Sequence, residues 1–119
     1  MKKILLLDDD PINNYVNQKF IEKTHPGSDV TEFLEAGQAL NYLKENTPDL
    51  IFLDIDLPHI NGWQFLHQYQ HFPNKSKIVI LTSSIDPTDK ERALAYDCVE
   101  GFIVKPLNSR ITRTELEKV

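Results

Sequence analysis

Side chains suited to metal-assisted phosphoryl chemistry stand at the ends of four short apolar runs in this chain. In chain order they are Asp8, Asp9, Asp10, Asp54, Thr82 and Lys105. Carboxylates that gather at one place raise each other's pKa, and a divalent cation such as Mg²⁺, which prefers oxygen ligands, removes that cost. A lysine ammonium and a hydroxyl are suited to the oxygens of a phosphoryl group. Together these residue types fit in-line transfer of a phosphoryl group to an aspartate.

The four apolar runs themselves predict buried strands. They cover Lys3–Leu7, Leu50–Leu53, 78–81 and 101–104. A continuous apolar run of this length is typical of a strand that is buried on both faces, as in a parallel sheet. Ligands of open parallel sheets bind beyond the carboxyl ends of the strands, so we expect the reactive side chains to meet at one edge of the sheet. A fifth segment, Asp29–Phe33, alternates polar and apolar residues and predicts an edge strand.

Helical periodicity fills the gaps between these strands. Helices are predicted at about 11–24, 36–47, 63–72 and 87–96, and from 107 or 108 to the end. Asp10 and Asp86 are the expected N-caps, because each precedes a proline suited to the first helical position. Strictly alternating strands and helices predict a doubly wound α/β fold, (βα)₅, with a five-stranded parallel sheet in a single domain of residues 1–119.

Composition narrows the function classes. The formal net charge is −5, and no basic cluster of the kind that nucleic-acid binding requires is present. Cys98 is the single cysteine, which excludes an internal disulfide and favours a small core residue over a nucleophile. No apolar stretch is long enough to cross a bilayer. We therefore expect a cytoplasmic protein with no nucleic-acid partner and no membrane insertion.

Five motifs, in order and spread over nearly the whole chain, carry a family resemblance. They are ILLLDDDP at 4–11, PDLIFLDIDLP at 48–58, Asn61-Gly62, ILTSS at 80–84 and GFIVKP at 101–106. With these motifs the chain resembles the receiver domain of two-component response regulators, of the stand-alone type without an output domain. The resemblance implies a flavodoxin-like fold with strand order 2-1-3-4-5.

The resemblance also implies a role for each matched residue. Asp54 is the phosphoacceptor, and Thr82 and Lys105 contact the phosphoryl oxygens. The Mg²⁺ ligands are Asp8, Asp9, Asp54 and the backbone carbonyl of Asp56. Thr82 and Phe102 form the switch pair, and the Lys105–Pro106 peptide bond is expected to be cis.

The function that follows from the resemblance is a phosphorylation switch rather than a turnover enzyme. A histidine kinase or histidine phosphotransfer protein would donate the phosphoryl group from a phosphohistidine, and slow autodephosphorylation would remove it. Ile12, Asn13 and Val16 are candidate donor contacts, although Ile12 and Val16 could equally be core residues. An unknown downstream protein would bind the face around Tyr96, Phe102 and Ile111, with the chain a monomer or a phosphorylation-dependent homodimer.

Several alternatives stay open. The chain could be a phosphorylation-independent adaptor with the same fold, and Asp54-x-Asp56 also matches the D-x-D motif of a phosphatase class. The Asp56 side chain could change the lifetime of the phosphoryl group or simply face solvent. His67 and His71 have a spacing that can bind zinc, but without a third ligand a solvated helix face is favoured. Trp63 is expected to pack its helix or to mark a contact surface.

Overall fold

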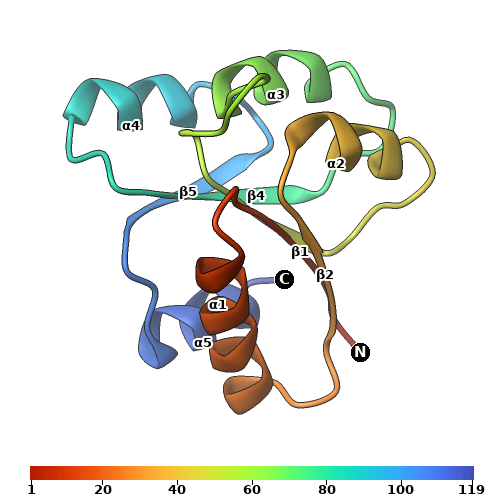
Figure 1. Cartoon of the computed structure of the whole chain (residues 1–119), viewed down its shortest axis with the longest axis vertical. Coiled ribbons are helices and arrows are strands. Elements are labelled where there is room, and N and C mark those ends of the chain that lie inside the picture. The colour runs from red at the N-terminus through yellow and green to blue at the C-terminus, as the bar shows by residue number, and fades with distance from the viewer.

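A computed structural model describes all 119 residues, with five strands and five helices in strict alternation (Figure 1). The strands are β1 (Lys3–Leu7), β2 (Asp29–Phe33), β3 (Leu50–Leu53), β4 (Lys77–Thr82) and β5 (Val99–Val104). The helices are α1 (Pro11–Thr24), α2 (Ala36–Leu43), α3 (Gly62–Tyr69), α4 (Pro87–Leu94) and α5 (Ser109–Glu117). The predicted (βα)₅ order is confirmed.

The five strands form one parallel sheet in the order β2-β1-β3-β4-β5, as the resemblance implied. The register pairs Leu7 with Leu53 and Leu53 with Ile80, so the carboxyl ends of β1 and β3 are level. Strand β5 begins at Val99, two residues before the expected start. Its first residue pairs with Ile78, and a register irregularity follows before the regular ladder resumes.

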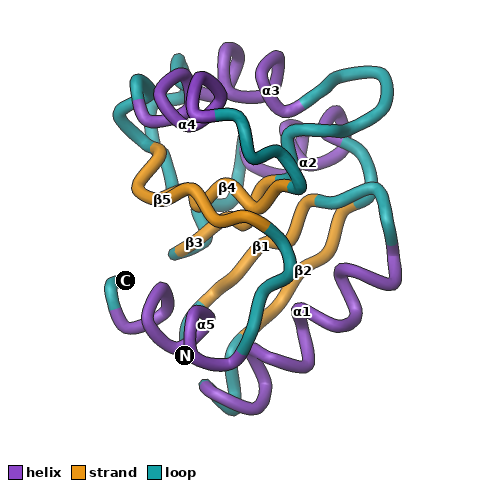
Figure 2. The backbone as a smooth tube through the Cα atoms, turned by 90° about the vertical axis from the view of Figure 1, so that its left-hand side faces the viewer, coloured by secondary structure: helices purple, strands orange, loops and turns teal.

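Helices cover both faces of this sheet. Figure 1 shows α2, α3 and α4 on one face and α1 with α5 on the other, and Figure 2 shows the same layers after a quarter turn. The larger core, of 17 buried residues, lies on the α2–α4 side and includes Phe65, Leu66 and Tyr69. The smaller core, of nine, lies on the side of α1 and α5 and includes Ile21 and Leu116. No helix is long and apolar enough to span a membrane.

Helix α1 buries a different face from the one that its apolar residues suggest. Its buried residues are Asn14, Asn17 and Ile21. Its first two turns instead expose apolar side chains, since Ile12 is 70% and Val16 43% exposed. This excludes the alternative in which Ile12 and Val16 are core residues.

The helix caps follow the sequence closely. The side chain of Asp10 accepts a hydrogen bond from the Ile12 N–H, and Asp86 caps α4 by accepting from the Thr88 N–H. Hydrogen bonds from Thr88 hold the pKa of Asp86 below its ordinary value. Helix α5 begins slightly later than predicted, because the side chain of Asn108 caps it.

Helix α4 ends at Leu94, two residues before the predicted end, and is largely exposed. Ala93 is its only buried residue. Leu94 is half-exposed, and Tyr96 lies beyond the end of the helix, where it packs partly against the larger core.

Candidate functional site

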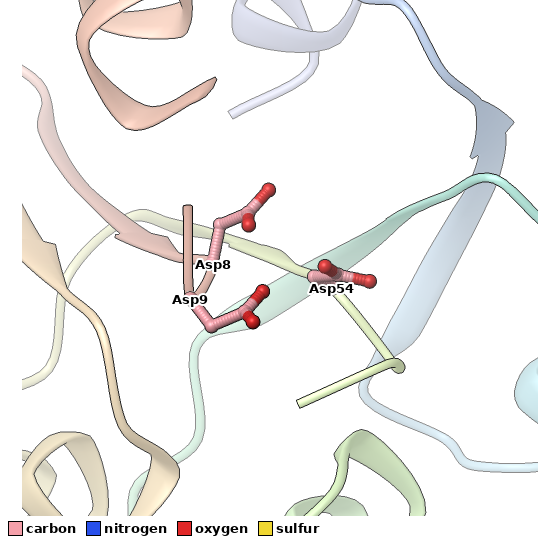
Figure 3. A group of neighbouring side chains, drawn as sticks. All are labelled: Asp8, Asp9 and Asp54. Atoms are coloured by element: carbon pink, nitrogen blue, oxygen red, sulfur yellow. The ribbon is translucent and has the colours of Figure 1, made fainter. Parts of the chain in front are cut away.

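Three carboxylates meet at the carboxyl ends of β1 and β3. Asp8 and Asp9 directly follow β1, and Asp54 directly follows β3. One oxygen from each lies within 4.8 Å of the others, and Figure 3 shows the three side chains extending into a common space. Asp8 and Asp54 are buried, at 4% and 5% exposure, whereas Asp9 is exposed. Asp10 does not join the group, because it caps α1.

Lys105 brings a positive charge to this group from the far end of the chain. Its Nζ lies 2.9 Å from Asp8 Oδ2 and 3.2 Å from Asp54 Oδ2. The residue stands just after β5, where its backbone N–H donates to the Thr82 carbonyl over 2.7 Å. The Lys105–Pro106 peptide bond is cis, as expected. One ammonium thus contacts the two buried carboxylates at once.

Burial and charge act in opposite directions on these groups. Burial raises the pKa of Asp54, with a smaller contribution from the charge of Asp8, although the Asp56 backbone N–H and Lys105 favour the ionised form. Burial alone would lower the pKa of Lys105, but its hydrogen bond to Asp8 and the charge of Asp54 raise it above the ordinary value. The protonated, charged form of Lys105 is therefore favoured, whereas burial disfavours the ionised form of the neighbouring Asp54.

Backbone amides fix the two buried carboxylates. Asp54 Oδ1 accepts a hydrogen bond from the Asp56 N–H over 3.0 Å, and Asp8 Oδ1 accepts from the Asp10 N–H over 2.9 Å. The Asp56 side chain itself is exposed and lies outside the group of three carboxylates. The D-x-D alternative requires the Asp54 and Asp56 side chains to act together. The structure does not place the Asp56 side chain with Asp54, so it does not support this alternative.

Thr82 and Phe102, the expected switch pair, occupy adjacent strands. Thr82 ends β4 and is fully buried, and its Oγ1 accepts a hydrogen bond from the Ser84 N–H over 3.1 Å. Ser84 Oγ in turn donates to Asp89 Oδ2 in the first turn of α4. Phe102 is half-buried in β5 and packs against the larger core. The threonine hydroxyl is therefore linked by hydrogen bonds to the start of α4.

Two asparagines of α1 contact the site, and the sequence indicated no such contact. Asn13 Nδ2 lies 3.4 Å from Asp8 Oδ2, and Asn14 Nδ2 donates to the Asp8 carbonyl over 3.1 Å. The signal that could have revealed the second contact is helical spacing, because Asn14 and Asn17 share a face with Ile21. That face packs on the sheet, so its amides lie beneath the carboxylates.

The other singled-out residues lie away from the three carboxylates. Trp63 is half-buried on α3, with the Arg92 guanidinium 4.1 Å from its ring centre. His67 and His71 stack edge to face, and no group of three possible metal ligands includes them. Cys98 is half-buried, and burial raises the pKa of its thiol. These contacts are consistent with packing rather than with a second site.

A family model and a solved structure both relate this chain to response regulators. The family model described as the response regulator receiver domain matches residues 4–117. Among solved structures, a two-component response regulator from Cytophaga hutchinsonii is 35% identical, with a TM-score of 0.88 and coverage of 98% of this chain and 94% of that one.

Curated relatives show the same relationship at lower coverage of their own length. The response regulator ArlR of Staphylococcus saprophyticus is 33% identical over 91% of this chain and 47% of its own length. A probable C4-dicarboxylate response regulator, DctR of Priestia megaterium, is 26% identical over 97% of this chain and 50% of its own length. The chain thus spans about half the length of these relatives.

Proposed function

This chain belongs to the response regulator receiver domain family, and we propose that it accepts a phosphoryl group on Asp54 in an Mg²⁺-dependent transfer. The single observation that carries the proposal is the contact of one ammonium, Lys105, with both Asp54 and Asp8 at the end of the sheet. Membership of the family and this geometry support the same residue as phosphoacceptor.

The donor set fits a hard divalent cation. Asp8, Asp9 and Asp54 offer only carboxylate oxygens, the ligand type that Mg²⁺ prefers. When bound there, Mg²⁺ would neutralise charge on the phosphoryl oxygens during transfer. We assign these three carboxylates and, by family resemblance, the backbone carbonyl of Asp56 to its coordination.

The chain's own residues would carry the transfer as follows. An oxygen of the ionised Asp54 carboxylate attacks phosphorus as the bond to the donor imidazole nitrogen breaks, and that imidazole takes a proton. Lys105 donates to an oxygen of the transferred group, and Thr82 donates from the adjacent strand end. Water later attacks phosphorus of the acyl phosphate, which restores the Asp54 carboxylate and releases inorganic phosphate. We place this chemistry in the cytoplasm.

The exposed apolar side chains of α1 are the proposed docking surface for the phosphohistidine donor, a histidine kinase or a phosphotransfer protein. Ile12, Tyr15 and Val16 are 70%, 58% and 43% exposed, and they lie within one helical turn of Asn13, which contacts Asp8. Apolar side chains this exposed on a helix beside the site suit a protein partner.

The output contact is proposed at the face around Tyr96, Phe102 and Ile111, where Thr82 and Phe102 would bias the position of α4.

Intact mass spectrometry after incubation with acetyl phosphate and Mg²⁺ tests the phosphoacceptor. We expect one added phosphoryl group in the native chain, none in Asp54→Asn, and an unchanged adduct in the control Asp97→Asn, because Asp97 is exposed and remote from the site. The absence of any adduct in the native chain would instead support the phosphorylation-independent adaptor.

A second experiment separates docking from chemistry. Ile12→Asp places a charge on the α1 surface at a side chain that is 70% exposed and contacts none of the three carboxylates. We expect it to slow transfer from a phosphorylated histidine-containing donor while leaving labelling by acetyl phosphate unchanged. Equal slowing with both donors would contradict the docking surface, because it would indicate damage to the site itself.

A further inference from the structure

The buried face of α1 carries two amides where packing alone would favour apolar side chains. Asn14 is 1% and Asn17 7% exposed, and both lie against the sheet between α1 and the carboxyl ends of the strands. A buried amide is costly unless both its donor and its acceptor are satisfied. These two residues therefore need partners at the base of the proposed phosphoacceptor site.

The donor side of Asn14 is satisfied and its acceptor side is not. Asn14 Nδ2 lies 3.1 Å from the Asp8 carbonyl and 3.4 Å from the Phe33 carbonyl. These two backbone acceptors require the NH₂ group to face them, which turns Oδ1 the other way. Asn14 Oδ1 is fully buried there and accepts no hydrogen bond from any protein group.

Asn14 lines a small cavity at the base of the site. It has a volume of about 10 Å³ and is lined by Asn14, Asn17, Asp8 and Asp54, with apolar side chains of β1, β3 and β4 completing the wall. A space of roughly 10–15 Å³ accommodates the centre of one water, which needs two to four polar partners. Four polar residues supply them, whereas a larger ligand has no room.

We propose that this cavity is a binding site for one internal water, held by Asn14 and Asn17, and that Asn14 acts through it as a positioning residue for Asp8. The water donates to Asn14 Oδ1 and so fixes the orientation of the amide. The amide in turn holds the Asp8 carbonyl, directly beside the carboxylate that contacts Lys105. The consequence for Asp8 as a metal ligand rests on the proposed function, whereas the water site itself does not.

Asn17 allows a shape-matched test, because the structure gives its side chain no direct hydrogen bond. Threonine and valine have the same shape, and the hydroxyl of threonine stands where valine has a methyl group. Neither Asn17→Thr nor Asn17→Val changes the two backbone carbonyls that accept hydrogen bonds from Asn14. Ser76→Ala is the remote control, because Ser76 Oγ is the other buried side-chain oxygen without a partner and lies just before β4, at the end of the strand away from the site.

The first readout is the water itself, in the native chain and each variant. We expect an ordered water within hydrogen-bond distance of Asn14 Oδ1 in a high-resolution crystal structure. We also expect cross-peaks between the Asn14 side-chain amide and a long-lived water by NMR. Both signals should persist in Asn17→Thr and Ser76→Ala and weaken in Asn17→Val. A dry cavity in the native chain would overturn the inference, whatever becomes of the phosphorylation experiment.

The second readout is Mg²⁺ affinity by calorimetry, compared with the free energy of unfolding. We expect Asn17→Val to weaken Mg²⁺ binding about fivefold, the effect of one hydrogen bond, with Asn17→Thr close to native. If Asn17 has a purely structural role, both variants should lower the free energy of unfolding by the same amount and leave the Mg²⁺ affinity unchanged. Equal Mg²⁺ affinity in Thr and Val variants that both retain the fold would overturn the positioning role.

Discussion

Removing the charge of Asp54 should stabilise the metal-free protein. At an effective dielectric constant of about 20, the contact with Lys105 at 3.2 Å is worth about 5 kcal/mol. Repulsion from Asp8, at 4.8 Å or less, costs at least about 3.5 kcal/mol on the same scale, and the exposed Asp9 adds roughly 1–2 kcal/mol. These terms nearly cancel, so the burial that raises the pKa of Asp54 decides the balance. For Asp54→Asn we expect a gain of about 1 kcal/mol, since Lys105 keeps Asp8 as its partner.

The pH dependence of this gain identifies its cause. Because the pKa of Asp54 is raised in the folded chain, the native protein loses stability as pH rises through that value. Asp54→Asn should therefore be more stable than the native chain at about pH 7, by roughly 4 °C in Tm, and should match it below pH 3.8, the ordinary carboxyl pKa, where Asp54 is protonated in both the folded and the unfolded chain. Thermal unfolding at the two pH values, in the presence of a chelator, measures both differences, with Asp97→Asn as the exposed-carboxylate control.

Two results would refute the reasoning about Asp54. A variant less stable than the native chain at pH 7 would mean that the Lys105 contact outweighs burial. A gain that persists unchanged below pH 3.8 would mean that the effect is not electrostatic. Saturating Mg²⁺ should favour the native chain instead, because a ligand stabilises the form that binds it more tightly.

Three further changes test other parts of the site. Lys105→Met should destabilise the metal-free protein by about 2 kcal/mol, since it leaves two buried carboxylates without their cation, and Mg²⁺ should restore part of the loss in thermal unfolding. Gly62→Ala should lower the free energy of unfolding by about 1–3 kcal/mol or more, because its Cβ would lie 2.4 Å from the Ile55 Cα; a native-like urea midpoint would contradict this close approach. Asp56→Asn should change the rate at which the phosphorylated chain loses its phosphoryl group, because the Asp56 side chain is exposed beside Asp54; an identical rate by time-resolved intact mass would exclude that role.

The strands and the meeting of the reactive side chains were predictable because both follow from short-range rules. Leu50–Leu53 is wholly apolar and buried on both faces, and parallel strands bring their carboxyl ends to one edge. Asp10 could be separated from Asp8 and Asp9 for an equally local reason, because a proline at the first helical position marks the residue before it as the cap.

The buried face of α1 could not be predicted from hydropathy. The helix exposes Ile12 and Val16 and buries Asn14 and Asn17. Two backbone carbonyls at the strand ends accept hydrogen bonds from the Asn14 side chain, which offsets the cost of burying that amide. Hydropathy reports burial only where the surroundings are apolar. The contacts of Lys105 could not be predicted either, because the residue type and its position in a motif do not determine which oxygens its long side chain contacts.

The long-range contacts of Lys105 also bear on how the chain folds. The hydrogen bonds to Asp8 and Asp54 span 97 and 51 residues, and the strands that carry them are not consecutive along the chain. Closing loops of this length costs conformational entropy, so we expect these contacts to form late in folding. During synthesis, the site cannot be complete until Lys105 has left the ribosome. The proposed ability to accept a phosphoryl group would then require β1, β3 and β5 to be in place, and chains that lack this arrangement would not be phosphorylated.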